Sequence, residues 1–344
     1  MTTVTQNRAH LAPKPKFWQY PAVRLGGSAL VLALLLTFVP FLQVWSAIRR
    51  IPTSLSLGLL GVYMVLHLMG VAKWRILVNV AGASLPFRQA VRCYYGGLFG
   101  NVFLPSLVGG DVVRAAMAFP VSRSKAAIVM GSLIDRTQDV IGLGAIAATG
   151  VLLLPRSLDE QSRKVFWAFG GALAVIGVLT IGTLFVLPVR KFPYKIRRIM
   201  VKLRCASRSM YGRWGSVLFC LALGIVLQVS QVAVNYWLGL ACGLHIAFGV
   251  WLFAWPLAKI SALLPVTQGG IGVREVALVG LLAPFGASSV LTAAAGLVYE
   301  AITTIGGLIA GIIAFLVGRI LTPHARPFEG VPAFQRSGDR APIE

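Results

Sequence analysis

The chain alternates between long apolar runs and short polar segments rich in lysine and arginine. Because a helix that crosses a bilayer needs about 18 or more predominantly apolar residues, runs of this length predict six membrane-spanning helices. They cover residues 25–45, 55–72, 126–154, 165–188, 214–240 and 289–318. The first run is too long for the core of a cleaved signal peptide and is expected to remain as a span.

Two further apolar stretches, residues 93–119 and 246–285, are interrupted by proline and by pairs of glycine. Proline removes a backbone donor and breaks a helix, so neither stretch predicts an unbroken crossing. We expect each to form a re-entrant helical hairpin that enters and leaves the membrane on one side. This threading keeps the strongly basic segment 189–213 on the same side as the other basic loops.

The positions of the charges predict which side of the membrane each loop faces. The chain has 32 Lys and Arg residues against 10 Asp and Glu residues, a net charge of +22. When both termini are placed in the cytoplasm, most of the basic residues, Lys73 among them, fall in cytoplasmic segments. This bias predicts a multi-pass protein of the bacterial cytoplasmic membrane with cytoplasmic N- and C-termini.

Composition excludes several classes of protein. The chain is 57% hydrophobic and 12% charged, against about 45–50% and 25% in soluble domains, which excludes a soluble globule. The basic excess then indicates contact with anionic lipid headgroups, and no nucleic-acid partner is expected. Four scattered cysteines predict neither a metal site nor a disulfide framework. The chain has no P-loop motif, and we expect no cofactor.

These patterns divide the chain into two membrane halves between polar tails. The predicted parts are a cytoplasmic tail 1–24, a first repeat 25–154 with hairpin 93–119, a second repeat 155–318 with hairpin 246–285 and basic cytoplasmic loop 189–213, and a cytoplasmic tail 319–344. In the basic loop, Ile196, Ile199, Met200 and Leu203 recur at helical spacing. They predict either an interfacial helix on anionic lipid or a solvated loop whose charges only report topology.

Both hairpins contain the motif L-P-x-x-x-G-G-x-x-x-R, which begins at Leu104 and again at Leu264, 160 residues later. In the topology above, the first hairpin enters from the cytoplasm and the second from outside. The halves therefore predict an all-α inverted repeat, an architecture typical of transporters. Two G-x-x-x-G patterns, residues 96–100 and 307–311, predict close packing of helices.

The repeated motif brings together groups that bind anions. Proline ends the entering helix, the glycine pair permits a sharp turn, and the returning helix begins with free N–H groups. Arg114 or Arg274 follows within a turn, which suits a phosphate. Alternatively, Asp111 caps its own helix and pairs with Arg114, closing the site without a ligand. The glycine pairs are Gly109 with Gly110 and Gly269 with Gly270.

Acidic residues within the apolar segments need partners, because each would cost about 2.5–3.5 kcal/mol at the centre of a lipid-exposed helix. A structural hypothesis is that they neutralise the embedded cations Arg114, Arg136, Lys259 and Arg274. A functional hypothesis is that they carry protons or bind a polar headgroup. The acids are Asp111, Asp135, Asp139, Glu275 and Glu300.

The segment from Asn101 to Arg114, the Asp135-Arg136 pair and the G-G-I-G-V-R-E sequence ending at Glu275 are similar to the transmembrane region of the lysylphosphatidylglycerol synthase and flippase family. The resemblance covers nearly the whole chain and implies movement of a lipid between leaflets. That family often has glycine where this chain has Ser106, and the soluble aminoacylating domain is missing, so synthesis of lysyl-lipid is not expected. Carried over, the resemblance marks as functional Asn101, Asp111, Arg114, Arg136, Arg274 and Glu275.

We therefore expect a flippase or scramblase that moves a phosphate-bearing lipid, such as an aminoacylated or glycosylated one, without ATP hydrolysis. Coupling to protons would use Asp135, Asp139, Glu275 or Glu300. The predicted substrate-binding residues are Asn101, Gly109, Gly110, Asp111, Arg114, Asp135, Arg136, Asp139, Gly269, Gly270, Arg274, Glu275 and Glu300.

Two alternatives remain open at this point: an integral membrane glycosyl- or acyltransferase that acts on a lipid-linked substrate, and a non-transporting scaffold for lipid synthesis. Membrane lipids are the expected partners, and a homodimer or a complex with lipid-biosynthesis enzymes is compatible with the sequence. A scaffold has no need of charges near the middle of the membrane, which favours transport over that alternative.

Overall fold

The computed structural model describes residues 41–49, 51–104, 109–153, 164, 201, 205, 208, 210, 212–262 and 272–321. Over these residues the secondary structure is entirely helical. The predicted span 165–188, most of the span 25–45, the basic loop around residues 196–200 and the glycine pair Gly269-Gly270 lie outside the described residues. The helices are α2 (Phe41–Arg49), α3 (Thr53–Val80), α4 (Phe87–Phe103), α5 (Gly109–Ala118), α6 (Lys125–Leu153), α9 (Trp214–Cys242), α10 (Phe248–Ser261), α11 (Val273–Leu282) and α12 (Ser289–Leu321), with short 3-10 turns at Phe119–Val121 and Ala283–Phe285.

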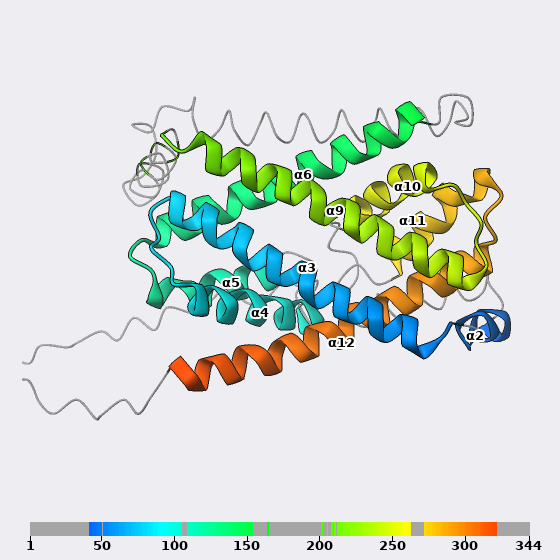
Figure 1. The fold of residues 1–344 in the computed structure, drawn as a ribbon, viewed down its shortest axis with the longest axis horizontal. Coiled ribbons are helices and arrows are strands. Elements are labelled where there is room, and N and C mark those ends of the chain that lie inside the picture. The colour runs from blue at the N-terminus through cyan, green and yellow to red at the C-terminus, as the bar shows by residue number, and fades with distance from the viewer. Residues whose placement is uncertain are drawn as a thin grey trace, which may run out of the picture.

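Four long helices, α3, α6, α9 and α12, run along the length of the molecule (Figure 1). Among the described residues, α3, α9 and α12 are long and apolar enough to cross a membrane. Helix α6 has 29 residues but carries charged side chains in its first half. The prediction that placed Lys73 in a cytoplasmic loop is wrong, because α3 continues through it to Val80 and buries its side chain.

The remaining helices form two pairs, α4 with α5 and α10 with α11. Each pair stands between two long helices in chain order, α4 and α5 between α3 and α6, and α10 and α11 between α9 and α12. Figure 1 shows the α4 and α5 pair at the end where α3 finishes, and the α10 and α11 pair at the opposite end, where α9 finishes. The two pairs therefore approach the middle of the molecule from opposite ends.

Each helix pair packs against a long helix of the other half of the chain. Helix α4 lies against α12, and α10 lies against α6. The principal helix contacts of the two halves correspond when α3 is matched with α9, α4 with α10, α5 with α11 and α6 with α12. The contact of α4 with α12, for example, corresponds to the contact of α10 with α6. The two halves thus share one packing pattern and are intertwined rather than side by side.

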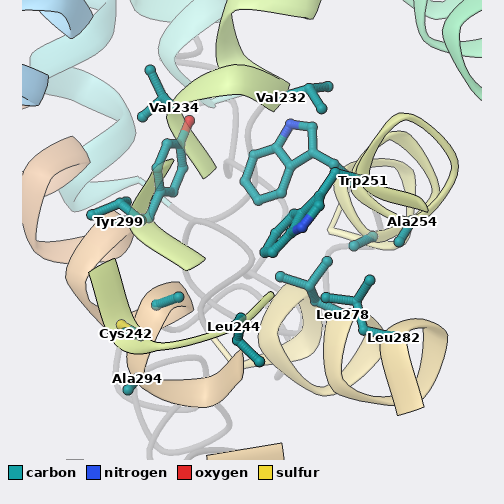
Figure 2. Close-up of a cluster of buried hydrophobic side chains, with 14 of the residues drawn as sticks. Val232, Val234, Cys242, Leu244, Trp251, Ala254, Leu278, Leu282, Ala294 and Tyr299 are labelled. Atoms are coloured by element: carbon teal, nitrogen blue, oxygen red, sulfur yellow. The ribbon is translucent and has the colours of Figure 1, made fainter. Parts of the chain in front are cut away.

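The interior of the second half is packed with large apolar side chains. Trp251, Phe253 and Trp255 of α10 are almost fully buried. Figure 2 shows the labelled side chains of this cluster, which come from α9, α10, α11, α12 and the turn at Leu244. Between helices in a membrane, close van der Waals packing of such side chains stabilises the cluster, since lipid tails are as apolar as the side chains themselves. This core holds α10 and α11 rigidly beside the long helices.

Glycines provide the close approaches between helices. A Cβ atom on Gly307 would lie 2.5 Å from Val102 of α4, and one on Gly311 would overlap the Phe99 ring. A Cβ atom on Gly100 would lie 3.0 Å from Val113 of α5. The prediction that these G-x-x-x-G patterns mediate close helix packing is confirmed.

We expect Gly150→Ala to destabilise the protein by about 1–3 kcal/mol, because overpacking forces the backbone to shift. The added Cβ atom would lie 2.5 Å from the backbone nitrogen of Phe253, so α6 and α10 must separate. Gly144→Ala on the same helix is the matched control. It has no atom within 4 Å of the added methyl group and should gain about 1 kcal/mol from helix propensity. Thermal denaturation in detergent would contradict this account if both variants changed stability in the same direction.

Candidate functional site

Charged side chains from α3, α5 and α6 form a closed ring in which cations and anions alternate. Each cation contacts two carboxylates, and each carboxylate contacts two cations. In order around the ring the members are Lys73, Asp135, Arg114, Asp111, Arg136 and Asp139.

The distances show that the ring is tight on its buried side. Lys73 Nζ lies 3.0 Å from Asp135 Oδ1 and 2.6 Å from Asp139 Oδ1. Arg114 Nη2 lies 3.3 Å from Asp135 Oδ2 and 3.0 Å from Asp111 Oδ1. Both oxygens of Asp135 are therefore occupied by cations from different helices, which ties α3 and α5 to α6.

Arg136 closes the ring on its more open side. Its Nη2 donates to Asp111 Oδ1 at 2.7 Å, its Nε also donates to Asp111, and its Nη1 lies 3.5 Å from Asp139 Oδ2. The Arg136 side chain is 46% exposed, against 4% for Arg114. Since Asp135 and Asp139 lie four residues apart on one face of α6, Arg136 projects from the adjoining face.

The turn between α4 and α5 positions Asp111 and Arg114. Asn101 Oδ1 accepts a hydrogen bond from the Gly110 N–H at 2.9 Å, which satisfies one donor at the start of α5. A Cβ atom on Gly97 would lie 2.7 Å from the Gly110 carbonyl oxygen, so the two helices meet backbone to backbone. This close approach explains why glycine stands at these positions.

A second charge cluster joins α11 to α12. Arg274 Nη2 lies 2.7 Å from Glu275 Oε1 and 2.5 Å from Glu300 Oε2. The other Glu275 oxygen accepts from the Gly272 N–H at 2.7 Å, where a backbone φ of 86° requires glycine. One guanidinium therefore serves two carboxylates, whereas the ring in the first half balances three cations against three acids.

Aromatic rings cover the guanidinium of each hairpin arginine. Arg114 Cζ lies 4.8 Å from the Trp74 ring centre and 5.2 Å from that of Tyr94. Arg274 Cζ lies 5.4 Å from the Trp255 ring centre and 4.8 Å from that of Tyr299. These cation–π contacts replace part of the hydration that each charge loses on burial.

A cavity of about 260 Å³ lies between the two clusters. Its walls come from both helix pairs and from the long helices, so charged groups of both halves face one space. Of the predicted site residues, the cavity is lined by Asn101, Gly110, Asp111, Arg114, Asp135, Arg136, Asp139, Arg274 and Glu300. Gly109 begins α5 beside the cavity, and Glu275 contacts its wall through Arg274.

Sequence reasoning missed several groups in this cavity. Lys73 closes the ion ring, although its position at the edge of an apolar run suggested a loop residue. Under the structural hypothesis an acid would neutralise Lys259, but its ammonium donates to the amide oxygens of Gln228 and Gln231. These two glutamines stand three residues apart inside an apolar helix, which is the signal that could have found them. Within the described ranges, His, Cys, Asp and Glu side chains form no group able to hold a metal ion.

The sequence model of the lysylphosphatidylglycerol synthase transmembrane region matches residues 22–311 of the chain. The protein belongs to this family. A UPF0104 membrane protein of Methanothermobacter thermautotrophicus is 23% identical over 326 residues, which cover 83% of this chain and 91% of that protein. Like that relative, this family member is a membrane protein, and its apolar helices indicate several crossings.

A second relative carries the name of an enzyme. Glycosyltransferase AglD of Haloferax volcanii is 27% identical over 226 residues, which cover 62% of this family member and 33% of AglD. The chain thus spans about a third of the length of that relative. The transferase name belongs to AglD as a whole protein.

Proposed function

We propose that this protein is a flippase or scramblase that moves a phosphate-bearing lipid between the leaflets of the cytoplasmic membrane without ATP hydrolysis. The observation that carries the proposal is the cavity that both charge clusters line. A polar headgroup crosses the bilayer at low cost only where charged or polar groups replace water, while its acyl chains remain in lipid. The family match supports a membrane domain of the flippase type.

The helix arrangement supports an inverted repeat with re-entrant hairpins. The α4–α5 and α10–α11 pairs approach the cavity from opposite ends, and the helix contacts of the two halves correspond. In transporters with this architecture, substrate sites lie near the midplane at the interface of the repeats. We infer a headgroup path past one hairpin, through the cavity and past the other, in a protein whose termini lie in the cytoplasm.

The experiment is leaflet exchange in proteoliposomes that contain labelled lipids with anionic or cationic headgroups, with a quencher added outside. Wild type should exceed the rate of protein-free liposomes for at least one headgroup. Arg274→Ala and Asp111→Asn should lower the protein-dependent rate at least tenfold, because each disrupts one charge cluster of the cavity wall. Arg319→Ala is the matched control, since Arg319 is exposed near the end of α12 and does not line the cavity.

Two results would overturn the proposal. One is a wild-type rate equal to that of empty liposomes for every headgroup. The other is exchange by both cavity variants at the rate of wild type, which would separate transport from the cavity. Repeating the assay with the proton gradient collapsed tests coupling, because an unchanged rate excludes a proton-driven mechanism.

The match to AglD favours a second candidate, a membrane transferase that acts on a lipid-linked substrate. Each of the five described acids already contacts an arginine or a lysine. Such pairing disfavours any of these acids as a general base, because the carboxylate of a general base must be free to take a proton. Transfer activity in the purified protein that Asp111→Asn abolishes would reverse the ranking of the two candidates.

A further inference from the structure

Lys259 differs from the other cations of the cavity in the groups that hold it. Lys73, Arg114, Arg136 and Arg274 all contact carboxylates. The Lys259 ammonium donates instead to Gln228 Oε1 at 2.8 Å and to Gln231 Oε1. No carboxylate among the described residues lies within 4.0 Å of it, so its charge keeps no direct counterion there.

The hydrogen bonds of Lys259 leave room for a ligand. An ammonium group has three N–H donors, and the two amide oxygens take one each. The third donor has no acceptor among the described residues. Glutamine oxygens orient the ammonium without neutralising it, whereas glutamates of the same length would form ion pairs. The side chain lines the cavity near the C-terminal end of α10.

Two residues of the cavity wall carry buried donors that are also without acceptors. Arg114 Nε and Trp255 Nε1 are buried and find no hydrogen-bond partner among the described residues. Both residues line the same cavity as Lys259. Both nitrogen atoms are closed off from the open space of the cavity, so a ligand would reach them only after neighbouring side chains moved. The donor that can meet a ligand is therefore the partly buried Lys259 ammonium, and the ligand it suits is an acceptor.

We propose that Lys259, oriented by Gln228 and Gln231, binds an oxyanion in the cavity. A phosphodiester in a lipid headgroup supplies this chemistry, and free inorganic phosphate supplies it as well. The assignment of the anion to a transported lipid rests on the proposed function. In this arrangement carboxylates hold Arg114 and Arg274 in the cavity wall. The anion binds Lys259, which has no carboxylate partner among the described residues.

The test is binding of soluble probes to the purified full chain in detergent, followed by calorimetry. The probes are dihexanoylphosphatidylglycerol, dihexanoylglycerol as its phosphate-free counterpart, and inorganic phosphate. Lys259→Gln should weaken binding of the phosphatidylglycerol probe at least tenfold and leave the phosphate-free probe unchanged. Lys125→Gln is the matched control, because it removes the same charge from an exposed site at the start of α6.

A second variant separates charge from folding. Gln231→Glu keeps Lys259 but gives its ammonium a carboxylate partner, so it should also weaken phosphate-dependent binding at least tenfold in a folded protein. Equal affinity of wild type and Gln231→Glu for every phosphate-bearing probe would overturn the inference. Inorganic phosphate that binds as tightly as the phosphatidylglycerol probe, with the same dependence on Lys259, would support the oxyanion site and assign it to free phosphate.

Failure of this inference is distinguishable from failure of the proposed function. If wild-type protein exchanges lipid and Gln231→Glu alters neither exchange nor probe binding, the flippase stands and the Lys259 site is wrong. If wild type exchanges no lipid but binds the probes in a Lys259-dependent manner, the oxyanion site stands and the flippase is wrong.

Discussion

Replacing Lys73 with methionine is expected to lower the free energy of unfolding by about 3–5 kcal/mol, the usual cost of removing one partner from a buried ion pair. The Lys73 side chain is 3% exposed and contacts two carboxylates. Without it, Asp135 and Asp139 each lose one of their two cation contacts. The ring would hold two cations and three acids and would no longer tie α3 to α6.

A double variant tests whether the effect comes from charge balance. Lys73→Met combined with Asp139→Asn leaves two cations and two acids, so it should be more stable than Lys73→Met alone. Lys125→Met is the control at an exposed position and should change stability by less than about 0.5 kcal/mol. Thermal denaturation of each purified variant in detergent measures the series. A double variant no more stable than the single one would show that the ring does not act as a unit.

Glu275→Ala is expected to destabilise the protein by roughly 2–4 kcal/mol, because one carboxylate satisfies both the Gly272 N–H and Arg274. The residue is 2% exposed. Its loss leaves a backbone donor unpaired at the start of α11 and gives Arg274 a single acid, Glu300. The expected result is a lower denaturation temperature and easier proteolysis within α11.

Glu275→Gln distinguishes the two roles of this side chain. The amide oxygen can still accept from Gly272, and Arg274 with Glu300 then forms a pair of equal and opposite charges. We expect this variant to lie much closer to wild type than Glu275→Ala in denaturation temperature. If the two variants were equally destabilised, the charge on Glu275 rather than its hydrogen bond to Gly272 would dominate.

The long helices were predictable because apolar runs are bounded by strong local signals. The run 126–154 corresponds to α6 at Lys125–Leu153, and the run 289–318 corresponds to α12 at Ser289–Leu321. Proline and glycine pairs marked both breaks between the short helices. The end of α3 was missed by hydropathy because Lys73 is accommodated by acids from another helix, a tertiary interaction that no local window contains.

The pairing of Asp111 with Arg114 followed from their spacing, and the structure shows that contact at 3.0 Å. The sequence could not predict that the ring closes, because closure depends on where α3 lies against α6. The hypothesis that an acid neutralises Lys259 was wrong for a similar reason. Nothing in the α10 sequence shows that two glutamines of α9 face that lysine, although a polar pair in an apolar helix indicates an interior role.

Because each pair of short helices packs on a long helix of the other half, the order of synthesis decides when each pair meets its partner. Helix α4 packs on α12, the last described helix to leave the ribosome, and α10 packs on α6, which is made long before it. At about 5–20 residues per second, translation leaves the first hairpin without its partner for roughly 10–40 seconds. During that interval α4 lacks the helix that covers it, whereas Asp111 and Arg114 already have partners on α6, the next long helix to be made. Expressed alone, either half would leave one face of its short helices without the long helix that covers it.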